Sequence, residues 1–211
     1  MDIVILASAS SRRRSWLSER IGGGNVELEF CELDGSEPPP RAGVEVKEQV
    51  FKSCMHKAKV ASSTIERGDP RARIIVVSDT LVEDPDDHLV ALGKPIDRAS
   101  AASTLIRLSG RRHVVWSSTA ILDRGAGEIE LDRGWKASSW TAFSIVEFEE
   151  IQEEDMVGML DSGAWKGKAG GYDLAGKAGE FSRVVEGEEV TVLGFSAEAI
   201  SDLEDRLARR M

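Results

Sequence analysis

The sequence has few of the residues that build metal or disulfide frameworks. Its 211 residues include two cysteines, Cys31 and Cys54, which form neither a CxxC motif nor a Cys/His spacing suited to zinc. The three histidines show no ligand spacing. These absences argue against structural zinc and against a disulfide-stapled fold.

The sequence also lacks long apolar runs and an excess of positive charge. No stretch approaches 18 apolar residues, and the apolar residues at the start precede a group of arginines, the reverse of a signal peptide. A net charge of -10 argues against a nucleic acid polymer as partner, because binding a polyanion usually requires a basic face. We therefore expect a cytoplasmic protein with a small-molecule partner and no membrane partner.

The glycine-rich stretch at residues 163–172 contains no complete phosphate-binding motif. Only three residues separate Gly163 from Gly167, and Ala169 follows Lys168 where a Walker A motif requires Ser or Thr. The tetrapeptide Gly-Lys-Ala-Gly occurs twice, at 167–170 and 176–179. Two interpretations stay open: a basic loop that wraps a nucleotide, and a simple connection between two elements.

Hydrophobic periodicity predicts an α/β protein in which helices alternate with strands early and consecutive strands follow later. With 211 residues the chain fits one domain or two small lobes. The expected strands are 2–7, 26–31, 73–77, 89–92, 113–122 and 127–148, with a hairpin at 180–193. The expected helices are 11–21, 44–65, a segment from Asp97 to Leu108, 149–160 and 196–210, with a glycine-rich loop at 161–179.

The first predicted strand runs into small hydroxyl residues, Ser8, Ser10 and Ser11, and then into Arg12-Arg13-Arg14. Cations in the first turn of a helix are disfavoured by roughly 0.3–1 kcal/mol each, whereas an anion is favoured there. A strand-to-helix turn with free N–H groups is how α/β proteins hold phosphate. The alternative is a serine N-cap followed by solvated arginines.

Asp79 lies where the most apolar predicted strand ends, in Ser78-Asp79-Thr80, and open α/β sheets bind ligands at such strand ends. A carboxylate there suits Mg²⁺ bridging phosphates, or the orientation of a water. The alternative is an Asp that caps a turn. Lys57 on the long helix and Lys94 in Gly93-Lys94-Pro95 gain interest only if they converge on Asp79 and the arginines.

Six blocks in this order and approximate spacing resemble the Maf family across almost the whole chain. They are Leu6-Ala7-Ser8-Ala9-Ser10-Ser11-Arg12-Arg13, Lys57-Ala58-Lys59, Ser78-Asp79-Thr80, Gly93-Lys94-Pro95, Leu108-Ser109-Gly110 with His113, and Gly167-Lys168-Ala169-Gly170-Gly171-Tyr172. The resemblance implies an inosine-triphosphatase-like fold, a long mixed β-sheet with flanking helices forming two lobes around a cleft, and a single domain over residues 1–211. It also implies a possible homodimer.

The resemblance implies a nucleoside triphosphate pyrophosphatase that uses a divalent cation, Mg²⁺ or Mn²⁺, and acts on dTTP, UTP or a modified nucleotide. Asp79, Lys57 and Lys94 would then be catalytic. Ser8, Ser10 and Arg13 would bind phosphate, and Arg12 and Thr80 would act on base selection. The metal ligands would be Asp79, with Asp34 or Glu37 as further candidates.

The chain departs from the family at Tyr172-Asp173-Leu174-Ala175-Gly176, where such members usually have Tyr-Gly-Ile-Gln-Gly. Ala175 replaces a glutamine tied to base choice, and alanine cannot hydrogen-bond a base edge. The family is also linked with inhibition of septum formation and cell division. The alternative function is therefore a non-catalytic nucleotide-binding regulator, which would need the phosphate site but not Asp79.

Overall fold

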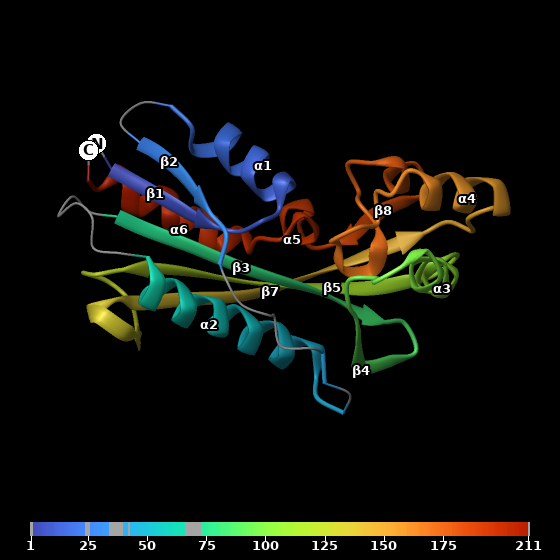
Figure 1. Ribbon diagram of the computed structural model, residues 1–211, viewed down its shortest axis with the longest axis horizontal. Helices are drawn as coiled ribbons and strands as arrows, with labels where there is room; N and C mark the ends of the chain where they lie inside the picture. Colours follow the sequence, from blue (N-terminus) through green and yellow to red (C-terminus); the bar gives the residue numbers. More distant parts are fainter. Residues whose placement is uncertain (1, 24–25, 34–39, 42, 66–72, 211) are drawn as a thin grey trace.

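A computed structural model describes residues 2–23, 26–33, 40–41, 43–65 and 73–210 (Figure 1). Two candidate metal ligands, Asp34 and Glu37, lie outside the described residues. None of the helices among these described residues combines the length and the apolar composition that a membrane span requires.

The described strands form one mixed sheet in the order β2-β1-β3-β5-β7-β6, with β4 paired to β3 and β8 paired to β7. β1 is parallel to β2 and β3, and the other pairs are antiparallel. The strands are β1 (Asp2–Ala7), β2 (Val26–Cys31), β3 (Arg73–Asp84), β4 (Asp87–Leu92), β5 (Arg112–Asp123), β6 (Ile129–Glu130), β7 (Lys136–Phe148) and β8 (Ser182–Glu186). The helices are α1 (Ser11–Ile21), α2 (Val46–Thr64), α3 (Arg98–Leu108), α4 (Glu153–Asp161), α5 (Glu189–Leu193) and α6 (Ala197–Ala208). The predicted long mixed sheet with flanking helices is confirmed.

Both faces of the first part of the sheet are buried, which explains why β1 has an unbroken apolar sequence. Ile3 and Ile5 pack against α2, whereas Val4 and Leu6 face α1 and α6. This two-sided packing follows from the alternation of side chains along a strand.

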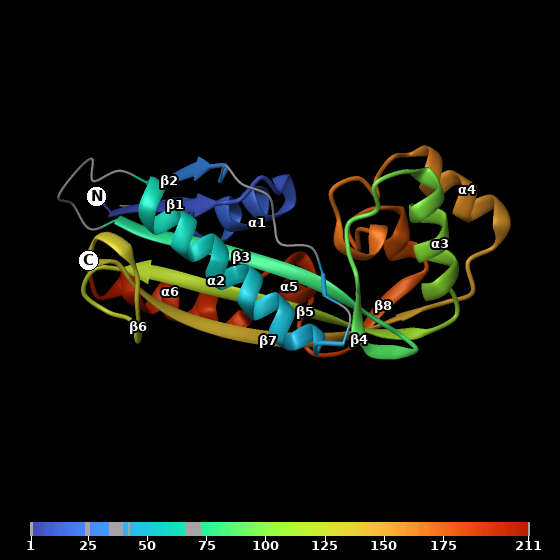
Figure 2. The ribbon, with the colours of Figure 1, turned by 60° about the horizontal axis from the view of Figure 1, so that its bottom comes forward.

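A third apolar cluster lies at the other end of the long strands, where α3 and α4 pack on β5, β7 and the glycine-rich loop (residues 161–179). Figure 2 shows α3, α4 and β8 gathered at this end, and α1, α2 and α6 at the opposite end. β3, β5 and β7 run through both groups of elements, so one sheet joins them.

The structure corrects three predicted segments. The predicted strand 127–148 is interrupted, since β6 is followed by a 3-10 turn at Asp132–Gly134 before β7 begins. The predicted helix 149–160 begins only at Glu153. The predicted hairpin at 180–193 is wrong, because β8 pairs with β7 and the chain then enters α5. Between β8 and α5, the Glu188 carbonyl oxygen accepts from Ser144 Oγ at 2.8 Å, and the Glu188 N–H donates to the same Oγ at 2.9 Å.

Candidate functional site

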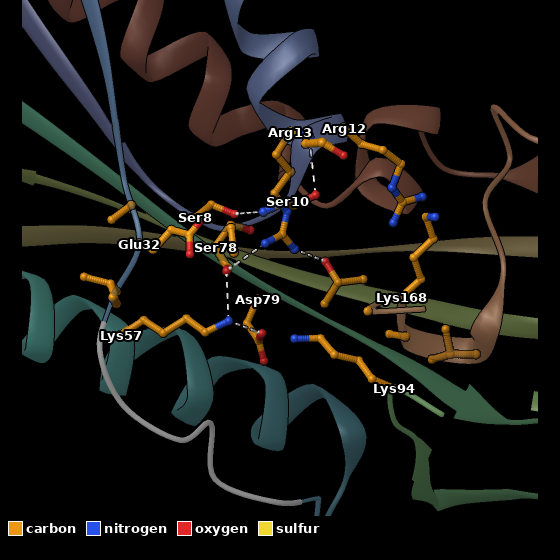
Figure 3. Close-up of a pocket in the computed structure, with 18 of the residues that line it drawn as sticks. Ser8, Ser10, Arg12, Arg13, Glu32, Lys57, Ser78, Asp79, Lys94 and Lys168 are labelled. Carbon is orange, nitrogen blue, oxygen red and sulfur yellow. Dashed lines mark hydrogen bonds and ion pairs between the residues drawn. The ribbon is translucent and has the colours of Figure 1, made fainter. Parts of the chain in front are cut away.

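A cavity of about 420 Å³ lies where the N-terminus of α1, the middle of β3, α2 and the glycine-rich loop meet (Figure 3). Among the described residues, its lining includes six Lys or Arg side chains and two Asp or Glu side chains. The cations are Arg12, Arg13, Lys57, Lys94, Lys166 and Lys168, and the acids are Glu32 and Asp79. The cavity is therefore a basic region in a chain of net charge -10.

The turn between β1 and α1 is built by its serines. Ser10 is the N-cap of α1 and accepts a 3.4 Å hydrogen bond from the N–H of Arg13, while Ser8 Oγ accepts one of 3.2 Å from the N–H of Ser10. The N-cap of the alternative interpretation is thus present, and Ser8, Ser10 and Ser11 all line the cavity.

Arg13 is buried rather than solvated, at 8% exposure. Its Nη1 donates to the carbonyl oxygen of Ser78 at 3.1 Å, and its Nη2 donates to Thr80 Oγ1 at 2.7 Å. The guanidinium therefore joins α1 to the middle of β3, and this inward orientation places a fixed positive charge at the cavity wall.

Arg14, expected to be a solvated residue, is instead partly buried and forms contacts with the protein. Its Nε donates to the carbonyl oxygen of Ser8 at 2.8 Å, and its Nη2 forms a 2.9 Å ion pair with Glu32. Arg14 thereby ties the β1–α1 turn to the residue that follows β2.

Lys57 and Asp79 form a close ion pair within the cavity. The Lys57 Nζ to Asp79 Oδ1 distance is 2.6 Å, and the side chains are 15% and 7% exposed. The carbonyl oxygen of Ser78 accepts from both Lys57, at 3.4 Å, and Arg13. One backbone carbonyl thus positions two cations beside the carboxylate.

Asp79 lies in the middle of β3, not at its carboxyl end as predicted. β3 continues to Asp84, and its polar residues Ser78 and Asp79 pair in register with Thr119 and Ser118 of β5. The polar residues of β3 that resemble a strand end in the sequence therefore continue the strand, because small hydroxyl residues of β5 lie opposite them.

Lys94 follows β4 and points toward Asp79 (Figure 3). The carbonyl oxygen of Gly93 accepts a 3.2 Å hydrogen bond from the N–H of Gly170, so the glycine-rich loop contacts the backbone that carries Lys94. The predicted convergence of Lys57, Lys94 and Asp79 on one site is therefore present in the structure.

Only two of the three base-selection candidates lie at the cavity. Arg12 and Thr80 line the cavity, whereas Ala175 is exposed and lies outside the lining. Thr80 Oγ1 accepts from Arg13 and lies 2.7 Å from Ser117 Oγ. Its hydroxyl group is thus already engaged by protein partners.

Asp173, for which no role is expected from the sequence, contacts two of the lining cations. Its Oδ1 accepts from Arg12 Nη1 at 3.0 Å and from the N–H of Ala175 at 3.1 Å, and its Oδ2 lies 3.5 Å from Lys168 Nζ. Glu32 was missed as well, because neither acid belongs to a motif. The departure from the family sequence at position 173 was the one available signal.

Tyr172 forms part of the apolar wall and is held by a buried histidine. His113 Nε2 lies 2.8 Å from the Tyr172 hydroxyl, and both rings pack against Phe148. Burial lowers the pKa of His113 to about 4 and raises the pKa of Tyr172 above its ordinary value. Both side chains are therefore neutral at pH 7.

The donor set fits a divalent cation held jointly with a ligand. Within the described residues no group of three His, Cys, Asp or Glu side chains could form an all-protein metal cage. Mg²⁺ is commonly bound by one or two carboxylates together with substrate phosphates. Asp79 and Glu32, the two acids of the lining, suit that arrangement.

The sequence model described as "Maf-like protein" matches residues 3–206. The chain belongs to the Maf family. One curated relative, a protein from Hahella chejuensis named dTTP/UTP pyrophosphatase, is 34% identical over 90% of this chain and 85% of its own. A Burkholderia pseudomallei (strain 1710b) protein of the same name is 32% identical over 90% of this chain and 87% of its own. Among solved structures, a HAM1 protein from Coxiella burnetii is 14% identical, covers 70% of this chain and 73% of its own, and has a TM-score of 0.42.

Proposed function

We propose that this Maf protein is a nucleoside triphosphate pyrophosphatase, which hydrolyses dTTP or UTP to the monophosphate and pyrophosphate. The observation that carries the proposal is the cavity, which six cations line together with the Asp79 carboxylate in an otherwise acidic chain. A triphosphate is the ligand that such a charge distribution fits. The printed names of the two relatives supply the bases.

Cleavage between the α- and β-phosphates requires cations to offset charge on the transferring and leaving groups, and a positioned water. Lys57, Lys94 and Arg13 supply this positive charge. Ser8 and Ser10 offer hydroxyl groups at the positive end of α1, where phosphate binds favourably. Asp79 orients the water or binds the metal, and Lys57 keeps its carboxylate in place.

Asp79 would hold Mg²⁺ or Mn²⁺, with Glu32 as the second described acid of the cavity. A divalent cation there supplies Lewis-acid stabilisation of charge on the phosphoryl oxygens. The ammonium groups of Lys57 and Lys94 would bind the remaining phosphate charge.

Base selection is proposed for Arg12 and Thr80, at the cavity wall. We propose that Ala175 affects base selection because its side chain has no donor or acceptor for a hydrogen bond to a base. Replacement of Ala175 by Gln is expected to shift the ratio of kcat/KM values toward dTTP or UTP relative to other triphosphates. An unchanged ratio would remove position 175 from base selection.

The reaction is tested by incubating the native protein with canonical and modified nucleoside triphosphates and Mg²⁺ or Mn²⁺, and by identifying the products with ³¹P NMR. The proposal predicts monophosphate and pyrophosphate in equal amounts, most rapidly from dTTP or UTP. Release of orthophosphate, or no turnover of any triphosphate, would contradict it. A non-catalytic nucleotide-binding regulator would bind triphosphate without turnover.

The remaining properties proposed for this protein are a single domain of two lobes, a homodimer and a cytoplasmic location. The dimer rests on the family resemblance. Sedimentation equilibrium would detect it as a mass of about twice the chain mass of 23.0 kDa, and a single-chain mass would contradict it.

A further inference from the structure

Three charged side chains join α1 to the glycine-rich loop at one side of the cavity. Arg12 and Lys168 line the cavity from opposite elements, and the Asp173 carboxylate contacts both, at 3.0 and 3.5 Å (Figure 3 labels the two cations). Asp173 is not among the lining residues, and its side chain is 14% exposed. The carboxylate thus contacts both cations without itself lining the cavity.

The loop is fixed on its other side by close backbone packing. The N–H of Gly170 donates to the carbonyl oxygen of Gly93, and a Cβ at Gly170 would lie 2.7 Å from Val82 Cγ2. This contact fixes the loop to β3 and to the backbone that carries Lys94. Asp173 supplies the contact with α1, so the loop links Lys94 on one side of the cavity to Arg12 on the other.

We propose that Asp173 is a positioning residue, which holds Lys168 at the cavity wall so that it binds the phosphates of the substrate, and holds the base-selection candidate Arg12 beside it. The inference deepens the proposed function and rests on it for the identity of the ligand. A glycine, which the family usually has at this position, has no carboxylate to form the link. The link is therefore a property of this chain.

If Asp173 is replaced by Ala, a positioning role and simple electrostatics predict opposite changes in the affinity of the cavity for an anion. Removing a negative charge beside two cations makes the cavity more positive, so electrostatics alone would tighten the binding of an anion. Loss of position would weaken binding, because two long side chains and the loop would have to be ordered by the ligand. The direction of the change therefore separates the two roles.

The test is the dissociation constant of inorganic pyrophosphate, measured by calorimetry for native protein and for Asp173→Ala, Asp173→Glu and Asp161→Ala. Asp161 is a matched control, since it is an exposed acid that pairs with Arg98 at the end of α4. We expect a roughly tenfold rise in the constant for Asp173→Ala, partial recovery in Asp173→Glu and less than about a twofold change in Asp161→Ala. Unchanged or tighter binding by Asp173→Ala, or no pyrophosphate binding by the native protein, would overturn the proposal.

Hydrogen exchange of the ligand-free proteins gives a second readout that needs no turnover. Amides of the glycine-rich loop should exchange faster in Asp173→Ala than in native protein, and at the native rate in Asp161→Ala. Equal loop exchange in native protein and Asp173→Ala would overturn the positioning role. If the native protein hydrolyses no triphosphate, the proposed function fails, while these two measurements still decide whether Asp173 positions the two cations.

Discussion

At the scale of single residues, the site depends on buried polar groups whose partners are distant in sequence. Arg13 bonds to the middle of β3, and Gly194 leaves room for its guanidinium, since a Cβ at position 194 would overlap Arg13 Nε. Gly194 also has a φ of +125°, which L side chains rarely adopt. The position therefore requires glycine for two reasons.

Replacement of Gly194 by Ala should displace Arg13 and destabilise the protein by about 2–3 kcal/mol. Chemical denaturation measures the loss. Gly23→Ala is the matched control, because Gly23 has a φ of +132° with no atom within 4 Å of the added Cβ, so it reports backbone strain alone. Equal losses in the two variants would mean that Arg13 is not displaced.

His113 should make stability depend on pH. Its pKa is about 4 in the folded protein, below the ordinary value of 6.5, so the unfolded chain binds more protons between these values. The contribution is fully present above pH 6.5 and is lost as the pH falls toward 4, which amounts to about 3 kcal/mol. The free energy of unfolding, measured from pH 7 to 4, should fall by that much more in native protein than in His113→Gln. Parallel curves would show that His113 is not buried as a neutral ring.

At the scale of elements, the bounds of helices and strands could be predicted best where a local sequence pattern determines them. The bounds of β1, α1 and β2 match the predicted ranges, because apolar alternation and the Ser10 N-cap are local signals. The polar half of β3 was missed because its partner residues on β5 lie about forty positions away. The Arg12–Asp173 link, between residues 161 positions apart, has no local signal at all.

The start of α3 was predicted correctly, with Asp97 as its N-cap. Asp97 accepts from the N–H of Ser100 at 2.7 Å, and the Asp97 N–H donates to Ser100 Oγ at 3.0 Å, forming a capping box directly after the Lys94 loop. Asp97→Ala should lower the melting temperature by about 3 °C, because a donor at the helix end loses its acceptor. Differential scanning calorimetry measures this. Asp205→Ala, at an exposed position of α6, should change it by less than about 2 °C, and an equal fall would argue against the cap.

At the scale of the whole molecule, one sheet brings distant segments to a single cavity. Arg12 and Arg13 arrive on α1, Lys57 on α2, Asp79 on β3 and Lys168 on the glycine-rich loop (Figure 3). Asp79 was a candidate because it follows the most apolar predicted strand, whereas Lys57 and Lys94 resembled surface lysines until the family resemblance was considered. The convergence itself could be seen only once the sheet order was known.

The central claim is that this cavity hydrolyses a triphosphate and that Asp79 takes part in the reaction. It is tested most directly by pyrophosphate release from dTTP and UTP, with Mg²⁺, by native protein, Asp79→Asn and the control Asp161→Asn. We expect release by native protein and the control, and a loss of about 100-fold to 10,000-fold in Asp79→Asn. Equal rates in native protein and Asp79→Asn would contradict the account.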